Sequence, residues 1–546
     1  MTTLRISTLD VGMVAGYFLL TIALGIWFGR RKIKDAEALF LADREATWPL
    51  IGASMFSANI SSQQFVGQAG LAYVIGLAAG AFQLVGAFCF VLLGSFFVDV
   101  YLKMRLRTAP EFFERRYSPG ARLFVSGINI AMILAANIAT ALYAGATVLT
   151  GLMGWEGATQ FNLAVGVIAV AAGTYTIFGG LRSVLWTDLL QATLLVGGGV
   201  VTFLVSLSAV GGWAGVLSTY DERGNSLWSV VQPWDHAFGW LPMVTGALIL
   251  GVHGHCTDHD YVQRALAARS LFHAKMGALF AALLKMLALF IIAAPGVIAA
   301  KLLPELAHPD QAYVRLVSAY VPAGLTGLVF AGLLAAILGT VAAGLSASSA
   351  MLTYDFALRA WPALSSRRRV LLGRGLMMAV LVLCAVAAPG IRQFKGVFTY
   401  LVQLWSLLAP PVFVCVVGGV FTRRATSQGA TATLMTGTVL GAATFWALGE
   451  PAVVEWFPAY LRSPLNWGFL ITLVCAAVMV GVSVSSAPPL IQEDVSDPVA
   501  LPAMTKGERR AFRVVVAGLL FGWVALVFTF SPWGLAGPLV GAASGE

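Results

Sequence analysis

The chain has 546 residues, of which 59% are hydrophobic and only 11% are charged, and its net charge is +9. A soluble domain carries roughly 25% charged residues, and its core could not bury so large an apolar fraction. The composition therefore excludes an ordinary soluble enzyme, a disordered protein and a nucleic-acid binder, and it predicts an all-α polytopic membrane protein. The five cysteines are far apart and form no CxxC pair, so we expect free, packed thiols.

Fourteen apolar segments are each long enough to cross a bilayer, which takes about 20 residues. They lie at 9–29, 48–73, 76–101, 123–151, 160–180, 184–210, 239–263, 274–300, 323–355, 370–390, 396–421, 427–448, 465–486 and 511–531. The first is too long for the apolar region of a cleavable signal, so we expect it to be a retained span. The connections are too short to hold a separate soluble domain. Residues 1–546 are therefore predicted to form a single membrane domain.

Lys and Arg residues mark the cytoplasmic side of a membrane protein. With fourteen spans, most of the 34 basic residues fall on one side, in connections that include 30–47, 102–122, 181–183, 264–273 and 356–369. This asymmetry accounts for the positive net charge. It also predicts that both termini face outside.

The second segment contains too many polar side chains for a helix that faces lipid. Asn59 and a run of serines and glutamines up to Gln64 lie between Gly52 and Gly67. Within a bilayer, unwound backbone is tolerated only where it lines a cavity or is buried in protein. We therefore predict an unwound binding segment here, with ordinary small-residue helix packing as the alternative.

The seventh segment has the same character, because Gly251–Arg264 holds three histidines and two aspartates after an apolar run. The two polar segments are five spans apart, and paired discontinuous helices point to the binding site of a secondary transporter. An odd repeat length places the two units inverted in the membrane. We therefore predict inverted repeats at 48–210 and 239–421, an extra helix at 9–29, and peripheral helices at 427–531.

Three further segments carry a polar residue with a predicted role. Asp188 begins the sixth segment on the inner side, where it is either an interfacial residue or part of an ion exit path. Lys285 lies deep in the eighth segment, where an ionisable residue indicates function and snorkelling is the alternative. Thr340 lies in the ninth segment, whose many small residues suit close packing. Its hydroxyl also suits a hard cation, which prefers oxygen ligands.

Four stretches of the chain resemble the sodium:solute symporter family, and in particular its bacterial sodium/galactose branch. They are Phe40–Arg44 leading into Gly52–Gly67, Thr108–Tyr117, Tyr175–Gln191 and Val262–Ala268. The resemblance runs from about residue 10 to 425. It implies about fourteen helices, a LeuT-type five-plus-five inverted repeat on spans 2–11, and a monomer in the plasma (inner) membrane of a bacterium. It also implies that the chain has no catalytic residues and no cofactor, with Na+ as the coupling ion.

The family's sodium site implies four oxygen ligands in this chain. Backbone carbonyls would come from Ser57, Ile60 and Ala336, and a hydroxyl would come from Thr340. The family has another hydroxyl residue directly before this threonine, where this chain has Gly339. Sodium is therefore expected, with weaker binding or a different coupling ion as the alternative.

A second sodium site is known in some members of the family, one turn further along the ninth segment. The matching positions are Ala342 and Ala343, whose side chains cannot bind a cation. We therefore expect one sodium ion per solute.

The sugar-binding branch implies a set of solute contacts. The matching positions are Asn59, Gln64, Gln83, Gly86, Gly251, Gly254, His255, Lys285 and Val402. Asn59, Gln64 and Lys285 agree with the branch in type, and Gln83 replaces a glutamate. Gly254 and His255 replace the gate tyrosine and its neighbouring tryptophan, so the aromatic gate is lost and galactose is disfavoured. We predict sodium-coupled uptake of another small hydroxylated solute, a sugar or polyol, by alternating access.

Three alternatives stay open. The same amides and lysine would suit a carboxylate, an amino acid or another small solute, coupled to sodium or to protons. A membrane metalloenzyme would use His253, His255, Asp258 and His259, but it lacks a second ligand cluster and a clear general base. A channel would need repeated filter segments. We expect no enzymatic activity, no metal other than sodium and no nucleic-acid partner; the partners are the solute, Na+ and the lipid bilayer.

Overall fold

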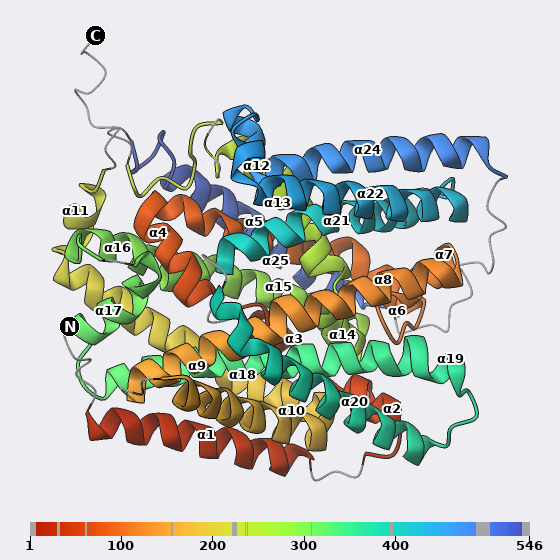
Figure 1. The fold of residues 1–546 in the computed structure, drawn as a ribbon, viewed down its shortest axis with the longest axis horizontal. Coiled ribbons are helices and arrows are strands. Elements are labelled where there is room, and N and C mark those ends of the chain that lie inside the picture. Colours follow the sequence, from red (N-terminus) through yellow and green to blue (C-terminus); the bar gives the residue numbers. More distant parts are fainter. Residues whose placement is uncertain are drawn as a thin grey trace.

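The protein is helical, as its composition predicts. The computed structural model describes residues 7–29, 33–60, 63–153, 155, 157–220, 226–234, 236, 238–306, 308–393, 397–487 and 503–537, and no β-strand occurs among them. The long helices run side by side along the long axis of the molecule (Figure 1). All five cysteines are buried free thiols, which confirms that prediction.

The chain forms both long and short helices. The longer helices are α1 (Thr8–Gly29), α3 (Trp48–Asn59), α5 (Ala81–Leu92), α8 (Pro119–Met132), α9 (Ala139–Met153), α10 (Ala158–Ala209), α15 (Leu271–Ala288), α18 (Leu325–Met351), α20 (Ser366–Ala387), α21 (Val397–Phe421), α22 (Ser427–Gly449), α24 (Pro464–Ser485) and α25 (Lys506–Thr529). The shorter helices are α2 (Ala36–Leu41), α4 (Ala69–Ile75), α6 (Val98–Lys103), α7 (Glu111–Arg116), α11 (Gly212–Leu217), α12 (Trp240–Val244), α13 (Gly246–Val252), α14 (His259–Leu266), α16 (Ala294–Leu302), α17 (Ala312–Tyr320), α19 (Leu358–Ala360) and α23 (Pro451–Val454).

Ten helices of the described chain are long and apolar enough to cross a membrane, and α1 adds a shorter apolar stretch at Thr8–Leu24. The protein is therefore a multi-pass membrane protein. Helices α3 and α12 to α14 stay outside this count because each of them is short. The predicted count of fourteen spans stays a prediction.

Helix α10 covers two of the predicted spans, 160–180 and 184–210. The two parts meet at Gly180, whose φ of 61° is left-handed and easily adopted only by glycine. A side chain at this position would also meet the carbonyl oxygen of Leu39 at 2.7 Å. The turn between the two predicted spans is therefore a one-residue kink with close backbone packing, rather than a loop.

Both predicted helix interruptions are present. Helix α3 ends at Asn59, Ile60 is extended (φ −85°, ψ 103°), and a π-helical turn at Gln63–Gln68 leads into α4. In the second repeat, a π-helical turn at His253–Thr257 follows α13, and Asp258 is extended (φ −68°, ψ 133°) before α14. Asp258 caps α14 because its side chain accepts a hydrogen bond from the backbone N–H of Asp260.

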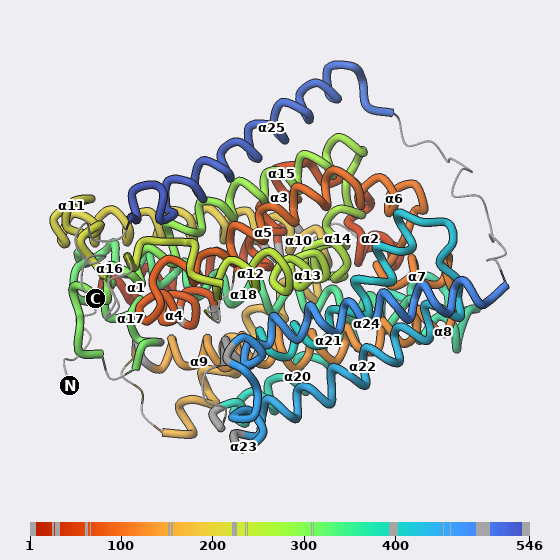
Figure 2. Tube along the Cα trace, turned by 90° about the horizontal axis from the view of Figure 1, so that it is seen from above, coloured from red at the N-terminus to blue at the C-terminus, as the bar shows by residue number. Residues whose placement is uncertain are grey.

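Burial separates a central helix from a peripheral one. In the segment that α18 begins, 94% of an 18-residue apolar stretch is buried inside the protein, and α18 packs against α10. In α25 only 6% of such a stretch is buried, and Figure 2 shows this helix along the edge of the molecule. The residues of α18 are therefore held by protein on all sides, whereas α25 presents most of its apolar surface outward.

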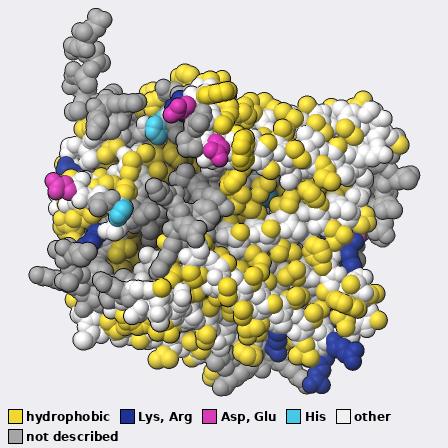
Figure 3. All heavy atoms as spheres, in the orientation of Figure 1, with side chains coloured by type: hydrophobic (Ala, Val, Ile, Leu, Met, Phe, Trp, Pro, Cys, Tyr) yellow, Lys and Arg dark blue, Asp and Glu magenta, His cyan; other side chains and the backbone are white. Residues whose placement is uncertain are grey.

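The surface is mostly apolar, and its charges are unevenly placed. Hydrophobic side chains dominate the face in Figure 3, and basic side chains without visible acidic neighbours gather at the right-hand end. The N-terminal end of α1 and the C-terminal end of α25 both lie at the opposite end (Figures 1 and 2). The basic end and the outer ends of α1 and α25 therefore lie at opposite ends of the molecule.

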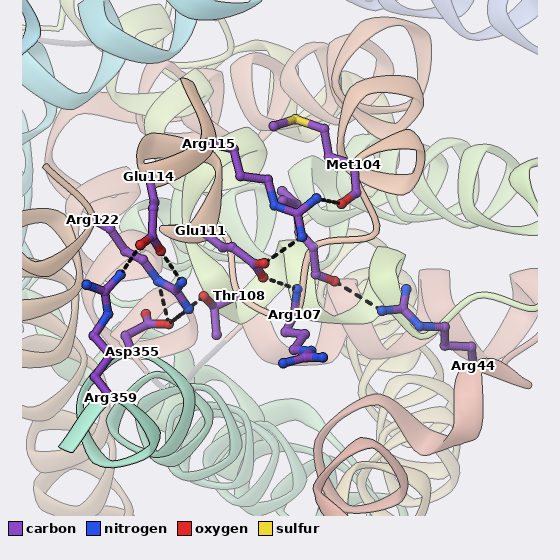
Figure 4. A network of polar contacts seen from close by, with 11 residues as sticks. Arg44, Met104, Arg107, Thr108, Glu111, Glu114, Arg115, Arg122, Asp355 and Arg359 are labelled. Atoms are coloured by element: carbon purple, nitrogen blue, oxygen red, sulfur yellow. Dashed lines mark hydrogen bonds and ion pairs between the residues drawn. The ribbon is translucent and has the colours of Figure 1, made fainter. Parts of the chain in front are cut away.

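A polar network joins α7, α8 and the end of α18 (Figure 4). The carboxylate of Asp355 is fully buried and accepts hydrogen bonds from Thr108 Oγ1 at 2.8 Å and Ser126 Oγ at 2.6 Å. Arg122 lies between this carboxylate, at 2.5 Å, and the carboxylate of Glu114, which also pairs with Arg359. The network fixes the connection between α6 and α8 against α18.

Candidate solute and cation site

A cavity of about 190 Å³ lies where the two interrupted helices meet. Five of its lining residues are the predicted solute contacts, Asn59, Gln64, Gln83, His255 and Lys285. The cavity is smaller than the roughly 300–1,000 Å³ of pockets for drug-sized ligands. The structure therefore brings the predicted contacts together around a space that suits a small solute.

Lys285 is buried on α15 and is held by the side chain of Gln83. Its Nζ donates to Gln83 Oε1 on α5 at 2.8 Å. The Nε2 of Gln83 in turn donates to Gln68 Oε1 at 2.5 Å and, more weakly, to Gln64 Oε1 at 3.4 Å. Gln68 Nε2 donates to the carbonyl oxygen of Ala79 at 2.7 Å. The lysine therefore ends a chain of amides that crosses the first repeat.

Gln68 was not predicted from the sequence. It lies four residues after Gln64, on the same side of the π-helical turn, and lines the same cavity. The signal was the spacing of four between two glutamines in an apolar segment, because residues at this spacing lie one above the other on a helix.

An aromatic pair lines the cavity beside Asn59. The rings of His255 and Tyr261 are stacked, with centroids 5.5 Å apart and an interplanar angle of 18°. Asn59 Nδ2 donates to the Tyr261 hydroxyl at 2.8 Å, and the Nδ1 of His255 contacts the Gly251 carbonyl at 2.8 Å. Although Gly254 stands where the family has its gate tyrosine, Tyr261 supplies a ring on this side of the cavity. The sequence did not indicate this role, because Tyr261 follows the helix break and its direction depends on the break.

Gly86 explains how lysine and histidine come so close together. A side chain at this position would meet Lys285 Cε at 2.8 Å and His255 Nε2 at 3.0 Å. The glycine on α5 therefore leaves room for both polar groups at the cavity wall.

Val402, the last of the predicted solute contacts along the chain, has an apolar side chain. Val402 lines the cavity together with Trp405 from the same helix, α21. Gln403 Nε2 donates weakly to the Phe445 carbonyl at 3.4 Å and does not line the cavity. The neighbouring glutamine therefore does not replace the one that the sugar-binding branch has at this position.

Of the predicted cation ligands, Thr340 lines the same cavity, and Ser57, Ile60 and Ala336 are buried. The Thr340 hydroxyl donates to the Ala336 carbonyl at 3.0 Å. Ile60 has left the helical conformation, so its carbonyl is not directed along α3 as a helical carbonyl would be. The donor set is oxygen alone, which suits a hard cation such as Na+.

Asp188 is fully buried and lies against both repeats. It accepts a hydrogen bond from Ser54 of α3, and its Oδ2 is 3.6 Å from Arg264 Nη2 of α14. Arg264 Nε also donates to Ser54 Oγ at 2.8 Å. Asp188 is thus held inside the protein, and its partner was not predicted because Arg264 is far away in the chain.

The histidines of the seventh segment do not converge. His253 contacts the Thr257 hydroxyl at 2.9 Å, His255 faces the cavity, and His259 Nδ1 accepts a hydrogen bond from the Ala109 backbone at 3.2 Å. No group of three metal-binding side chains occurs within the described ranges. The geometry therefore gives the metalloenzyme alternative no ligand cluster among these residues.

A family comparison decides the class of protein. The model of the sodium:solute symporter family matches residues 39–437, more than half of the chain. The chain belongs to the sodium:solute symporter family. This confirms the resemblance on which the predicted cation and solute contacts depend.

Curated relatives of this symporter include bacterial and animal proteins. It is 27% identical to a sodium/glucose cotransporter of Vibrio parahaemolyticus, over 96% of this chain and 98% of the relative. It is 32% identical to a sodium/mannose cotransporter of Bos taurus, over 80% of this chain and 79% of that protein. A sodium/myo-inositol cotransporter 2 of Rattus norvegicus is 31% identical, over 79% and 69% of the two chains.

A solved structure shows the same fold. The symporter superposes on a Na+-coupled sialic acid symporter in its substrate-bound outward-open state with a TM-score of 0.72 and 18% identity, over 88% of this chain and 99% of the other. At this identity the likeness establishes the fold alone. The fold is of the LeuT type, as the two interrupted helices predict.

Proposed function

We propose that this symporter uses a sodium gradient to take up a small, neutral, hydroxylated solute, a sugar or polyol, by alternating access. The observation that carries the proposal is the cavity in which Lys285 and the amides of Gln83 and Gln64 face the same space as Asn59. Ammonium and amide groups together offer donors and acceptors to hydroxyl groups. The names of the relatives, which couple sodium to glucose, mannose or myo-inositol, support the same class of solute.

The coupling is proposed to act through the interrupted helix α3. Thr340 lines the solute cavity and also touches the Ala336 carbonyl of the predicted cation site. A cation that binds to Thr340, Ser57 and Ile60 would hold α3 in one conformation, and that same helix carries Asn59 at the cavity. Two ligands that favour one conformation strengthen each other's binding.

Asp188 is proposed to lie on the route by which the cation leaves. Its carboxylate is held by Ser54 and Arg264, one from each repeat. When the inner half opens and α14 moves away from α10, this carboxylate would lose its basic partner and would attract a cation. The Asp188–Arg264 pair is thus proposed to alternate with an Asp188–cation contact.

A second candidate solute is a small carboxylate. Lys285 donates to an amide instead of pairing with a carboxylate, so its charge could serve an anionic solute. The neutral solute is favoured because three glutamine side chains line the cavity near the lysine and match hydroxyl groups better than a carboxylate.

The remaining features of the proposal concern the cellular setting. We place this symporter in the inner (plasma) membrane of a bacterium, with both termini outside, working as a monomer that binds the solute, Na+ and lipid. The basic end of the molecule would then face the cytoplasm (Figure 3). We propose no enzymatic activity, no cofactor and no nucleic-acid partner.

The deciding experiment is uptake into proteoliposomes that contain the purified protein. Labelled glucose, mannose, myo-inositol and short monocarboxylates are each offered with an inward sodium gradient, with an inward proton gradient, and with neither. We expect uptake of at least one hydroxylated solute with the sodium gradient only. Uptake that follows protons instead, or uptake of monocarboxylates alone, would contradict the proposal.

A further inference from the structure

Gly339 marks a gap in the predicted cation site, and the structure shows what lies in it. A side chain at this position would place its Cβ atom 2.7 Å from Gln191 Oε1, 2.7 Å from Ser57 Oγ and 3.5 Å from the Ser57 carbonyl oxygen. Three oxygens from α10 and α3 therefore converge on the space where a hydroxyl side chain of α18 would otherwise start. One of them, the Ser57 carbonyl, already belongs to the predicted ligands.

The orientation of the Gln191 amide follows from its hydrogen bonds. The Tyr175 hydroxyl donates its proton to the Leu338 carbonyl at 3.0 Å, so its oxygen can only accept a second bond. Gln191 Nε2 lies 3.5 Å from this hydroxyl and is therefore the donor. The amide oxygen must then point the other way, toward Ser57 and Gly339.

The oxygen of Gln191 is also weakly engaged. Its contact with the Ser57 hydroxyl is 3.3 Å long, although the side chain is fully buried. Hydrogen bonds of hydroxyl donors are ordinarily about 2.7–2.8 Å. An amide oxygen has two lone pairs, so this one keeps the capacity to accept a stronger partner.

We propose that Gln191 Oε1 is a ligand of the coupling cation and takes the place of the hydroxyl that Gly339 lacks. The inference rests on the proposed function, because it requires a cation at Thr340. It restores the site to three carbonyls, one hydroxyl and one amide oxygen, a set of hard oxygen ligands that suits Na+. It also explains why a glycine at position 339 is compatible with sodium coupling.

The test measures binding of 22Na+ to the purified protein without any solute. Gln191→Met keeps the size of the side chain but replaces its oxygen by a soft sulfur, a poor ligand for a hard cation. We expect its sodium affinity to fall about ten- to hundredfold, the range for losing a polar partner of a charge. Gln191→Glu removes the donor to Tyr175 but keeps an oxygen, so it is expected to retain binding. Thr202→Val is the matched control, because the buried Thr202 hydroxyl lies on the same helix, donates to the Gly198 carbonyl and is not among the proposed cation ligands.

A rescue experiment distinguishes a ligand from a packing role. Gly339→Ser combined with Gln191→Met supplies a new hydroxyl and is expected to recover most of the sodium affinity, whereas Gly339→Ala in the same background is not. If Gln191→Met does not fold, Gln191→Leu takes its place, and apparent melting temperature and monodispersity are checked for each variant. Unchanged affinity in Gln191→Met, or equal recovery by serine and alanine, would overturn the inference.

The failure of the proposed function gives a different result. Absence of saturable 22Na+ binding in the unmodified protein, or normal binding in Thr340→Ala, would remove the cation site itself and the inference with it. Loss of binding in Thr340→Ala with normal binding in Gln191→Met would leave the cation site in place and would reject only the role of Gln191.

Discussion

The hydroxyl of Thr340 can serve the protein and a cation at the same time. Its proton is donated to the Ala336 carbonyl, so the lone pairs of Oγ1 are left for another partner. Thr340 is the only side chain that the family pattern assigns to the cation, and it also lines the solute cavity. A change at this single atom should therefore affect sodium binding first and solute uptake as a consequence.

We expect Thr340→Ala to raise the sodium concentration for half-maximal uptake at least about tenfold, because a hydrogen-bonding partner of a charge is lost. Thr340→Ser keeps the hydroxyl and should change this value little. Uptake measured across a sodium series in proteoliposomes checks both variants. An alanine variant with the sodium dependence of the unmodified protein would contradict the assignment.

A substitution at Lys285 distinguishes a neutral solute from an anionic one. Lys285→Gln keeps a donor at the cavity and loses the positive charge. With a neutral hydroxylated solute, we expect transport to continue with an affinity reduced about tenfold. With an anionic solute, transport should be abolished, because a buried carboxylate without its partner is strongly destabilised.

Solute competition against labelled uptake provides the measurement for Lys285. Monosaccharides and polyols should compete in both the unmodified protein and Lys285→Gln. Competition by short monocarboxylates alone would show that the lysine is a counter-ion and that the neutral solute is the wrong choice.

Site residues were predictable from the sequence where a local pattern of residue types marked them. Asn59, Gln64 and Lys285 are polar in apolar segments, and they line one cavity. Tyr261 and the Asp188–Arg264 pair were not predicted, because each depends on how a break or a distant helix directs a side chain. The interactions that sequence reasoning missed are therefore long-range ones.

At the scale of elements, the network at Glu114 holds a short helix in place. Helix α7 has six residues, too few to be stable alone, so its position depends on contacts such as those of Glu114 with Arg122 and Arg359. Burial raises the pKa of Glu114, but hydrogen bonds from these two arginines lower it more, and the net pKa is below its ordinary value. The charged carboxylate is thus the form that stabilises the fold.

A lowered pKa gives stability that is present above the unfolded pKa and is lost as the pH falls through the folded pKa. We expect Glu114→Gln to lower the apparent melting temperature at neutral pH, by the equivalent of about 1 kcal/mol or less because the side chain is part-exposed. The difference from the unmodified protein should shrink on acidification. Thermal melts in detergent from pH 7 downward measure it, with Glu45→Gln as a control on a more exposed ion pair. A difference that grows with acid would refute the assignment.

The two helix interruptions were predictable as elements because polar residues stand out in apolar segments. The boundary between the fifth and sixth spans was harder to predict from the sequence. The sequence predicts a short connection there, and the structure reduces it to the single non-helical residue Gly180 between the two helical parts of α10. A glycine in an apolar run does not reveal a positive φ until the close approach of Leu39 is known.

At the scale of the whole molecule, the family and the all-α fold followed from composition and motifs, whereas the number of spans stays a prediction. The coupling ratio belongs to this scale too. Ala342 and Ala343 are fully buried in α18 and offer no side-chain oxygen to a second cation.

We therefore expect one sodium ion, and one positive charge, per neutral solute. Charge movement in proteoliposomes, divided by labelled solute taken up under the same conditions, gives the ratio directly. Two charges per neutral solute, or a Hill slope for sodium near two, would show a second cation site elsewhere.

The amide chain behind Lys285 has a fixed polarity. An ammonium group at one end can only donate, and the Ala79 carbonyl at the other end can only accept. Neither Gln83 nor Gln68 can therefore turn over, because a reversed amide would set two donors or two acceptors against each other. Each hydrogen bond from Lys285 through Gln83 and Gln68 to Ala79 therefore has its donor on the side nearer the lysine. Lys285 can donate its further N–H groups to lone pairs of the solute, and the cavity-lining amides of Gln64, Gln68 and Gln83 offer both donors and acceptors beside it.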